Sequence, residues 1–169
     1  MPGLVRFTVI HGLGSLDIGA MIWMWTRDGA KHRATTSSIR SRSMFREGGQ
    51  YVEEVTLDRQ HFRERLFLES PFKAVMDGAP EVRRRLHDAD CPLDYPVLSD
   101  LRDEGITDYL ALPLEISEGI VHAVSLATDA PGGFSGEEVE RLRVISQLLA
   151  IAIQTIGLRR ETVLDRRLM

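Results

Sequence analysis

The sequence predicts an α+β fold in which helices pack on a central antiparallel sheet, and three observations support this class. Several short segments alternate apolar and polar residues, as half-buried strands do. The segments 106–116 and 120–128 are joined by a short Gly-containing turn, which is typical of a hairpin. A long run with helical periodicity then closes the chain. Strands, short helices, a hairpin and a long helix in that order indicate helices segregated on one sheet.

Length and composition fit one ordinary globular domain. A chain of 169 residues can bury a real core, and we expect a single domain with its core at about 4–134 and a C-terminal helix at about 135–166. The net charge of −4 gives no reason to expect nucleic acid or an anionic membrane as a partner. The sequence has no apolar run of the ~20 residues that a membrane span needs, and no signal-peptide pattern. We therefore expect a cytoplasmic location, which the single cysteine also fits.

The first half of the chain is expected to supply strands. Large apolar and β-branched residues are frequent in three segments that we predict to be strands: 4–10, 19–26 and 51–57. The segment 31–46 carries five Lys and Arg residues and no acidic residue. We interpret it as a solvated loop, with an anion-binding arm as the alternative. Residues 59–66 suit a helix and a strand equally well.

The second half alternates short helices with strands. A helix is predicted over 70–76, because its first residue is a capping Ser and its second is a Pro. A strand at 81–86 and a helix at 97–104 that ends at Gly105 follow. In the first strand of the hairpin, alternate apolar residues share one face: Leu110, Leu112, Leu114 and Ile116.

The closing helix has a strongly specified start. Ser135 can cap the first amide groups of a helix, and Glu138, three residues later, completes a capping box. Phe134 and Val139 are spaced so that they can pack together across that start. A helix that continues from here to Arg166 is ~45 Å long.

Two apolar stripes run along this helix. The first consists of Leu142, Ile145, Leu149, Ala152 and Ile156. The second is displaced around the helix axis and consists of Val144, Leu148, Ile151, Thr155 and Leu158. One stripe is enough to cover the sheet, so the second predicts burial against something else. The simplest partner is the same helix of a second copy, related by a two-fold axis. The two helices would contact each other through Leu148, Ile151, Thr155 and Leu158. A central helix buried within a monomer is the alternative.

No residue pattern indicates catalysis. The chain lacks a Walker-type phosphate-binding loop and a nucleophile with a base at recognisable spacing. The histidines show no metal-ligand spacing, so we assign no metal site. The nearest approach to a ligand set is His87 and Cys91, with Asp88 and Asp90 between them. A haem or metal sensor that uses Cys91 with His87 or His122 is an alternative. We therefore expect a protein that is not an enzyme, and its cofactor is unknown.

Two motifs resemble those of a known family. The first comprises Gly105, Thr107, Asp108, Tyr109, Ala111, Leu112, Pro113 and Leu114. The second runs from Thr128 to Ser135 and reads T-D-A-P-G-G-F-S. Together with 70–71, 83–86 and 95–98, they resemble the GAF-like regulatory region that precedes the catalytic domain in many bacterial class III adenylate cyclases. The resemblance covers residues 70–160 well and the first half of the chain loosely.

The resemblance implies both a fold and an assembly. It implies a central antiparallel sheet of five or six strands with a ligand-sized pocket on one face, and a dimer whose terminal helices pass a signal to paired cyclase domains. We expect the pocket to be lined by Trp23, Trp25, Tyr109, His122 and Ser125. The family has a helix ahead of the first strand, whereas strand-like residues begin here at Leu4. No cyclase domain follows within these 169 residues, so this chain alone is not expected to make cyclic AMP.

The sequence thus predicts a sensory or regulatory domain that controls cyclic AMP synthesis by a fused catalytic domain. The alternatives are a module that only dimerises and binds no small molecule, and a haem- or metal-binding sensor. The ligand is unidentified. The cyclic-nucleotide motif of GAF domains needs Asn, which this chain lacks. Bilin-binding relatives have His after the attachment Cys, whereas Cys91 is followed by Pro92.

Overall fold

The computed structural model describes residues 3–12, 20–27, 39–47, 50–57, 60, 63–117 and 120–165. At 11–12, 20–21, 23, 39–47, 50–51, 116–117, 120–121 and 156–165 it describes the backbone without the side chains. The described part of the chain forms one seven-stranded antiparallel sheet of order β3-β4-β2-β1-β7-β6-β5. Its strands are β1 (Leu4–Gly12), β2 (Ala20–Thr26), β3 (Ile39–Glu47), β4 (Gln50–Leu57), β5 (Val82–Arg84), β6 (Asp108–Ser117) and β7 (Ile120–Thr128).

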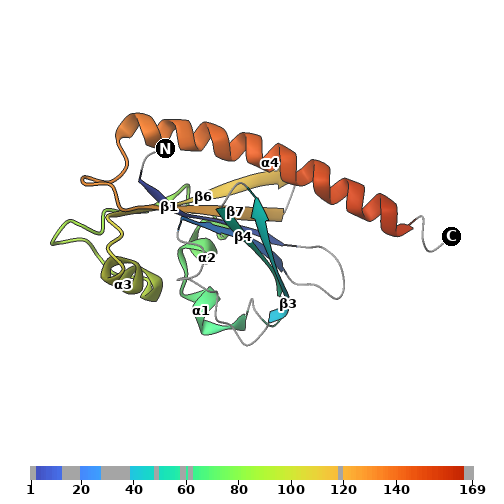
Figure 1. Ribbon diagram of the computed structural model, residues 1–169, viewed down its shortest axis with the longest axis horizontal. Coiled ribbons are helices and arrows are strands. Elements are labelled where there is room, and N and C mark those ends of the chain that lie inside the picture. Colours follow the sequence, from blue (N-terminus) through green and yellow to red (C-terminus); the bar gives the residue numbers. More distant parts are fainter. Residues whose placement is uncertain are drawn as a thin grey trace.

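Helices cover both faces of this sheet (Figure 1). The long helix α4 (Gly136–Asp165) lies across one face, which we call the α4 face. Three short helices lie on the other side, which we call the α2 face: α1 (Arg65–Leu68), α2 (Pro71–Met76) and α3 (Pro96–Asp103). Within the described residues, no helix is both long enough and apolar enough to cross a membrane. The α+β class with helices on an antiparallel sheet is therefore confirmed.

Alternation along the central strands divides the core between these two faces. Leu110, Leu112 and Leu114 of β6 pack with Val139 and other apolar residues of α4. The intervening residues of β6 pack against the short helices, and the core on this side includes Ile10, Val55, Leu57, Val75, Leu98, Leu101, Ala111 and Ala123. A strand with both faces buried must be apolar on both, and this explains why 109–114 contains no charged residue. The predicted apolar face of this strand is confirmed for its described members.

The prediction of a loop over 31–46 is wrong for its second half. Residues 39–47 form β3, which pairs with β4 at one edge of the sheet. This strand also makes the sheet larger than the five or six strands expected. A strand at an edge has one bonded neighbour and tolerates charged side chains, so it need not show apolar alternation. The anion-binding alternative concerns side chains of 31–46 that lie outside the described residues.

The local signals for the short helices are confirmed. The hydroxyl of Ser70 caps α2 by accepting the Lys73 amide at 3.2 Å. Helix α3 ends at Asp103, and Gly105 beyond it has a φ of +86°, a conformation that favours glycine. In the ambiguous segment 59–66, α1 begins at Arg65.

The start of α4 is confirmed, but the stripe that faces the sheet is not the predicted one. Ser135 and Glu138 form the capping box: the Ser135 amide donates to Glu138 Oε2 at 2.9 Å, and the Glu138 amide donates to Ser135 Oγ at 3.2 Å. The residues that α4 buries are Val139, Leu142, Ser146, Ala150 and Ile153.

The predicted first stripe drifts away from this buried line. Leu142 is buried and Leu149 is half-buried, but Ile145 is 50% exposed and Ala152 is also exposed. The side chain of Ile156 lies outside the described residues. Ser146 is polar and belongs to neither predicted stripe. Its hydroxyl donates to the Arg143 carbonyl at 2.7 Å, and this bond lets a serine occupy a buried helix position.

Candidate functional site

The five residues predicted to line a pocket lie on both faces of the sheet. Tyr109 and Ser125 are buried on the α2 face. Trp25 pairs with Phe7, and His122 pairs with Leu114, and both of these partners pack on the α4 side. Trp25 and His122 are therefore on the α4 face. The side chain of Trp23 lies outside the described residues.

One pocket cannot take in all of these residues. The correction follows from the period of a strand: Ser125 and His122 are three positions apart, so their side chains point to opposite faces. Tyr109 and Ser125 lie on the same face of the sheet. That they line a pocket stays a prediction.

Around these two residues the α2 face carries a group of buried polar side chains, which we call the polar cluster: Arg6, Thr8, Thr26, Tyr109 and Ser125. Register places them together. Arg6 pairs with Thr26 on one side and with Ala127, the partner of Tyr109, on the other. Thr8 pairs directly with Ser125. Both threonines, the tyrosine and the serine are buried, with exposures of 4–8%.

The polar cluster has a definite electrostatic character. Burial lowers the pKa of the Arg6 guanidinium, against the opposing effects of Glu104 and Tyr109. Burial also raises the pKa of Tyr109 to about 12, although its interaction with Ser125 and the charge of Arg6 act the other way. Tyr109 is therefore a neutral phenol at neutral pH. The arrangement presents one cation on the same sheet face as four hydroxyl groups, which is suited to binding oxygen-rich groups.

Sequence reasoning missed three members of the polar cluster: Arg6, Thr8 and Thr26. From the sequence, a strand is predicted at 4–10 but no site residue within it. A signal was present, because Arg6 and Thr8 are polar residues two positions apart in an otherwise apolar strand and so share a face. Glu53 of β4 lies on the same face, is 7% exposed, and pairs with Met24, the residue that also pairs with Thr8.

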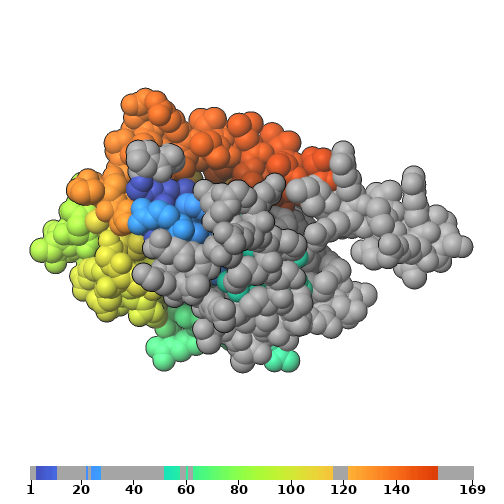
Figure 2. All heavy atoms as spheres, in the orientation of Figure 1, coloured from blue at the N-terminus to red at the C-terminus, as the bar shows by residue number. Residues whose placement is uncertain are grey.

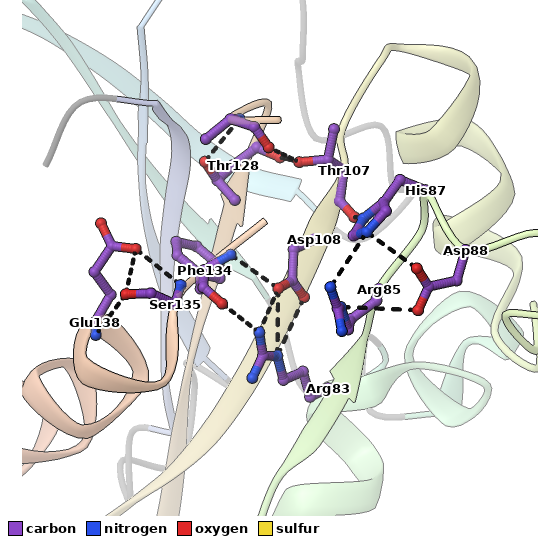
Figure 3. Close-up of polar contacts among 11 residues, drawn as sticks. Arg83, Arg85, His87, Asp88, Thr107, Asp108, Thr128, Phe134, Ser135 and Glu138 are labelled. Carbon is purple, nitrogen blue, oxygen red and sulfur yellow. Dashed lines mark hydrogen bonds and ion pairs between the residues drawn. The ribbon is translucent and has the colours of Figure 1, made fainter. Parts of the chain in front are cut away.

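A second group of polar residues joins the sheet to the start of α4 (Figure 3). Asp108 is fully buried and accepts a hydrogen bond from Arg83 Nη2 at 2.7 Å. It also accepts the Phe134 amide at 3.0 Å, while Arg83 Nη2 donates to the Phe134 carbonyl at 2.6 Å. These bonds tie β5, β6 and the residue before the cap of α4 together. We call this group, with Gly133, the joint.

The turn that enters the joint is shaped by glycine. Gly133 has a φ of +75°, and a Cβ there would lie 2.6 Å from Asp108 Oδ2. The neighbouring Thr107 hydroxyl donates to the Ala130 carbonyl at 2.7 Å, and the Thr128 hydroxyl donates to the Gly3 carbonyl at 2.7 Å. The two motifs that carried the family resemblance thus meet in space. Their polar residues hold the base of α4 in place.

The outer side of α4 is apolar and exposed in the single chain. Val144 and Ile145 are 58% and 50% exposed, and Leu148 and Ile151 are each 62% exposed. Thr155 is exposed as well, and the side chain of Leu158 lies outside the described residues. Figure 2 shows the described part of α4, in orange and red, along one edge of the molecule. The second stripe is therefore not used by the sheet of its own chain.

Of the residues in the haem or metal hypothesis, the fold separates Cys91 from His122. Cys91 packs against the core of the α2 face, whereas His122 is on the α4 face. The Nδ1 atom of His87 lies 2.9 Å from the Thr107 carbonyl, and its Nε2 lies 3.0 Å from Asp88 Oδ1. Within the described part of the chain, no three His, Cys, Asp or Glu side chains are grouped so that they could hold a metal ion. A shared site of Cys91 and His122 is therefore wrong.

The arrangement of sheet and helices has a counterpart among solved structures. The crystal structure of the GAF domain of a two-component sensor histidine kinase from Bacillus halodurans matches 92% of this chain and 85% of its own, with a TM-score of 0.50 and 14% sequence identity. Likeness at this identity shows the fold, and the chain has a GAF-like fold. No family model and no curated protein matches the sequence.

Proposed function

We propose that this chain is a cytoplasmic sensory domain that regulates a fused class III adenylate cyclase, and so controls cyclic AMP synthesis. In this proposal a small molecule binds on the α2 face, two copies pair through α4, and the catalytic domains follow α4. The GAF-like fold supports the sensory role. The link to a cyclase rests on the two sequence motifs. The chain itself carries no catalytic residue in this reading.

The observation that carries the proposal is the exposed apolar side of α4. Val144, Leu148, Ile151 and Thr155 follow each other at intervals of four, three and four residues. This is the spacing of the seam between two helices of a coiled coil. The residues that α4 buries on its own sheet, such as Ser146 and Ile153, belong to other positions of the same repeat. A second copy of the helix is the simplest partner, because a two-fold axis brings the same surface of both copies together.

The joint supplies a route from the sheet to this seam. A ligand changes an equilibrium only when it binds one arrangement better than another. Asp108 and Arg83 connect the sheet directly to the backbone of Phe134, one residue before the cap of α4. A ligand-dependent shift of β6 would therefore be passed to the base of the helix, and the helix pair would carry it to the catalytic domains.

The oligomeric state tests this proposal. We expect the chain to sediment as a dimer at tens of micromolar, and Leu148→Glu to convert it to a monomer, because two buried charges would face each other across the seam. Leu66→Glu is the matched control. Leu66 is 54% exposed on α1, so the same substitution there should leave the dimer intact.

Two results would contradict the proposal. One is a wild-type chain that sediments only as a monomer, and the other is a dimer that survives Leu148→Glu. The cyclase link is tested with the same variants in a fusion to a class III catalytic domain. Production of cyclic AMP should fall with Leu148→Glu and stay unchanged with Leu66→Glu.

A further inference from the structure

We propose that the ligand of the α2 face is an anion, and that its carboxylate or phosphate group binds Arg6 in place of Glu104. The inference rests on the proposed function, since it names the ligand class of that domain and the change that binding causes. It is carried by the position of Arg6, by the hydroxyl groups around it, and by the place of Glu104 at the end of α3.

Arg6 holds a charge in the middle of the sheet with few partners. It lies on β1, between β2 and β7, and its side chain is 17% exposed. The nearest acidic atom is Glu104 Oε2 at 3.7 Å, which is beyond hydrogen-bond distance. A guanidinium has five N–H donors in a plane, and within the described part of the chain this ion pair is its one charged contact. The group is thus available for an acceptor with better geometry.

The surroundings of Arg6 favour an oxyanion. Thr26 is directly across from Arg6 in the register, and Thr8 is the next residue on the same strand and face. Tyr109 is close enough for its pKa to respond to the charge of Arg6. Hydroxyl groups can donate to a carboxylate or phosphate while the guanidinium forms paired N–H···O bonds with it. A cationic group would be repelled by Arg6.

Glu104 connects occupancy of this site to the joint. It directly follows α3, its side chain is 34% exposed, and an incoming anion would compete with it for Arg6. Only Gly105, Ile106 and Thr107 separate Glu104 from Asp108, the buried centre of the joint. Release of Glu104 would therefore alter the segment that leads into β6 and the base of α4.

Titration calorimetry with inorganic phosphate and with citrate as separate probes tests this inference. Wild type should bind at least one of them, and the probe that binds distinguishes a phosphate ligand from a carboxylate ligand. Arg6→Gln should weaken binding by about tenfold or more, because it removes the charged donors. Arg6→Lys, which keeps the charge but loses the planar fork, should bind with intermediate affinity. Glu104→Gln should strengthen binding, because the competing charge is gone.

The controls separate this inference from folding and from the proposed function. Arg65→Gln is the matched arginine variant, since the Arg65 side chain is 86% exposed on α1, and it should bind like wild type. Glu104→Gln alters a partly exposed residue, so it still tests the competition for Arg6 if the Arg6 variants fail to fold. Failure of both probes to bind wild type, unchanged binding by folded Arg6→Gln, or weaker binding by Glu104→Gln would each overturn the inference. Loss of the wild-type dimer would instead count against the proposed function.

Discussion

At the scale of single residues, the buried carboxylate of Asp108 is a site where a substitution should be costly. It is 0% exposed and serves both the Arg83 guanidinium and the Phe134 amide. Asp108→Ala should lower the free energy of unfolding by about 3 kcal/mol, because it leaves a charged and a neutral donor without their acceptor. Urea unfolding followed by circular dichroism measures this change. Asp94→Ala, which removes the more exposed partner of Arg84, should cost at most about 1 kcal/mol. Equal costs at the two sites would contradict this account.

Tyr109 should give the fold an alkaline limit. Burial raises its pKa from 10.0 to about 12, so between these values the unfolded chain loses a proton that the folded chain keeps. Stability therefore falls as pH rises through this window, by up to about 3 kcal/mol, and is unaffected by Tyr109 below it. Denaturant titrations between neutral pH and pH 12 measure the decline, which should be smaller in Tyr109→Phe. A steeper decline in the phenylalanine variant would show that the sign is wrong.

At the scale of elements, the turn before α4 is built for a close approach. Gly132 and Gly133 both have positive φ, but a Cβ at Gly132 meets open space and one at Gly133 meets Asp108. Gly132→Ala should cost about 1 kcal/mol through backbone strain alone. Gly133→Ala should cost clearly more, because the same strain is added to a displaced carboxylate. Thermal unfolding of the two variants makes the comparison. Similar melting temperatures would mean that Asp108 can move aside for the added Cβ without loss of stability, which would contradict this prediction.

Elements specified by neighbouring residues could be predicted from the sequence, and those specified across the sheet could not. The cap of α4 depends on Ser135 and Glu138, three residues apart, so its start was predictable. The strand β3 owes its existence to pairing with β4, and its own residues carry no strand pattern. The spacing of Ser125 and His122 is enough to show that their side chains point to opposite faces of the sheet. Which of these faces meets α4 is set by register with distant strands.

The candidate site shows the same division. Tyr109 and Ser125 were named as candidates from the sequence, whereas Arg6 was not. The spacing of Arg6 and Thr8 shows that they share a face, but it does not show that Glu104 and Tyr109 lie near Arg6. The residues of the two family motifs were noticed for their resemblance alone. Their role in the joint became visible once Asp108 and Phe134, 26 positions apart, were placed in hydrogen-bond distance.

At the scale of the whole molecule, the two faces of the sheet hold different residues. The α2 face carries polar side chains under short helices, and the α4 face is covered by one long helix with apolar residues on both its inner and outer sides. In the proposed dimer, the first face receives the ligand and the second supports the partner. The joint lies where β6 begins, and there Asp108 bonds both Arg83 of β5 and the backbone of Phe134 just before α4 (Figure 3).

The geometry of α4 also has a mechanical consequence. The helix packs on the sheet as far as Ile153, and its last residues extend past the end of the β6–β7 hairpin (Figure 1). Thirty helical residues span about 45 Å. In the proposed dimer, a tilt of the whole helix would displace this overhanging end most, because it lies farthest from the buried residues that hold α4 on the sheet.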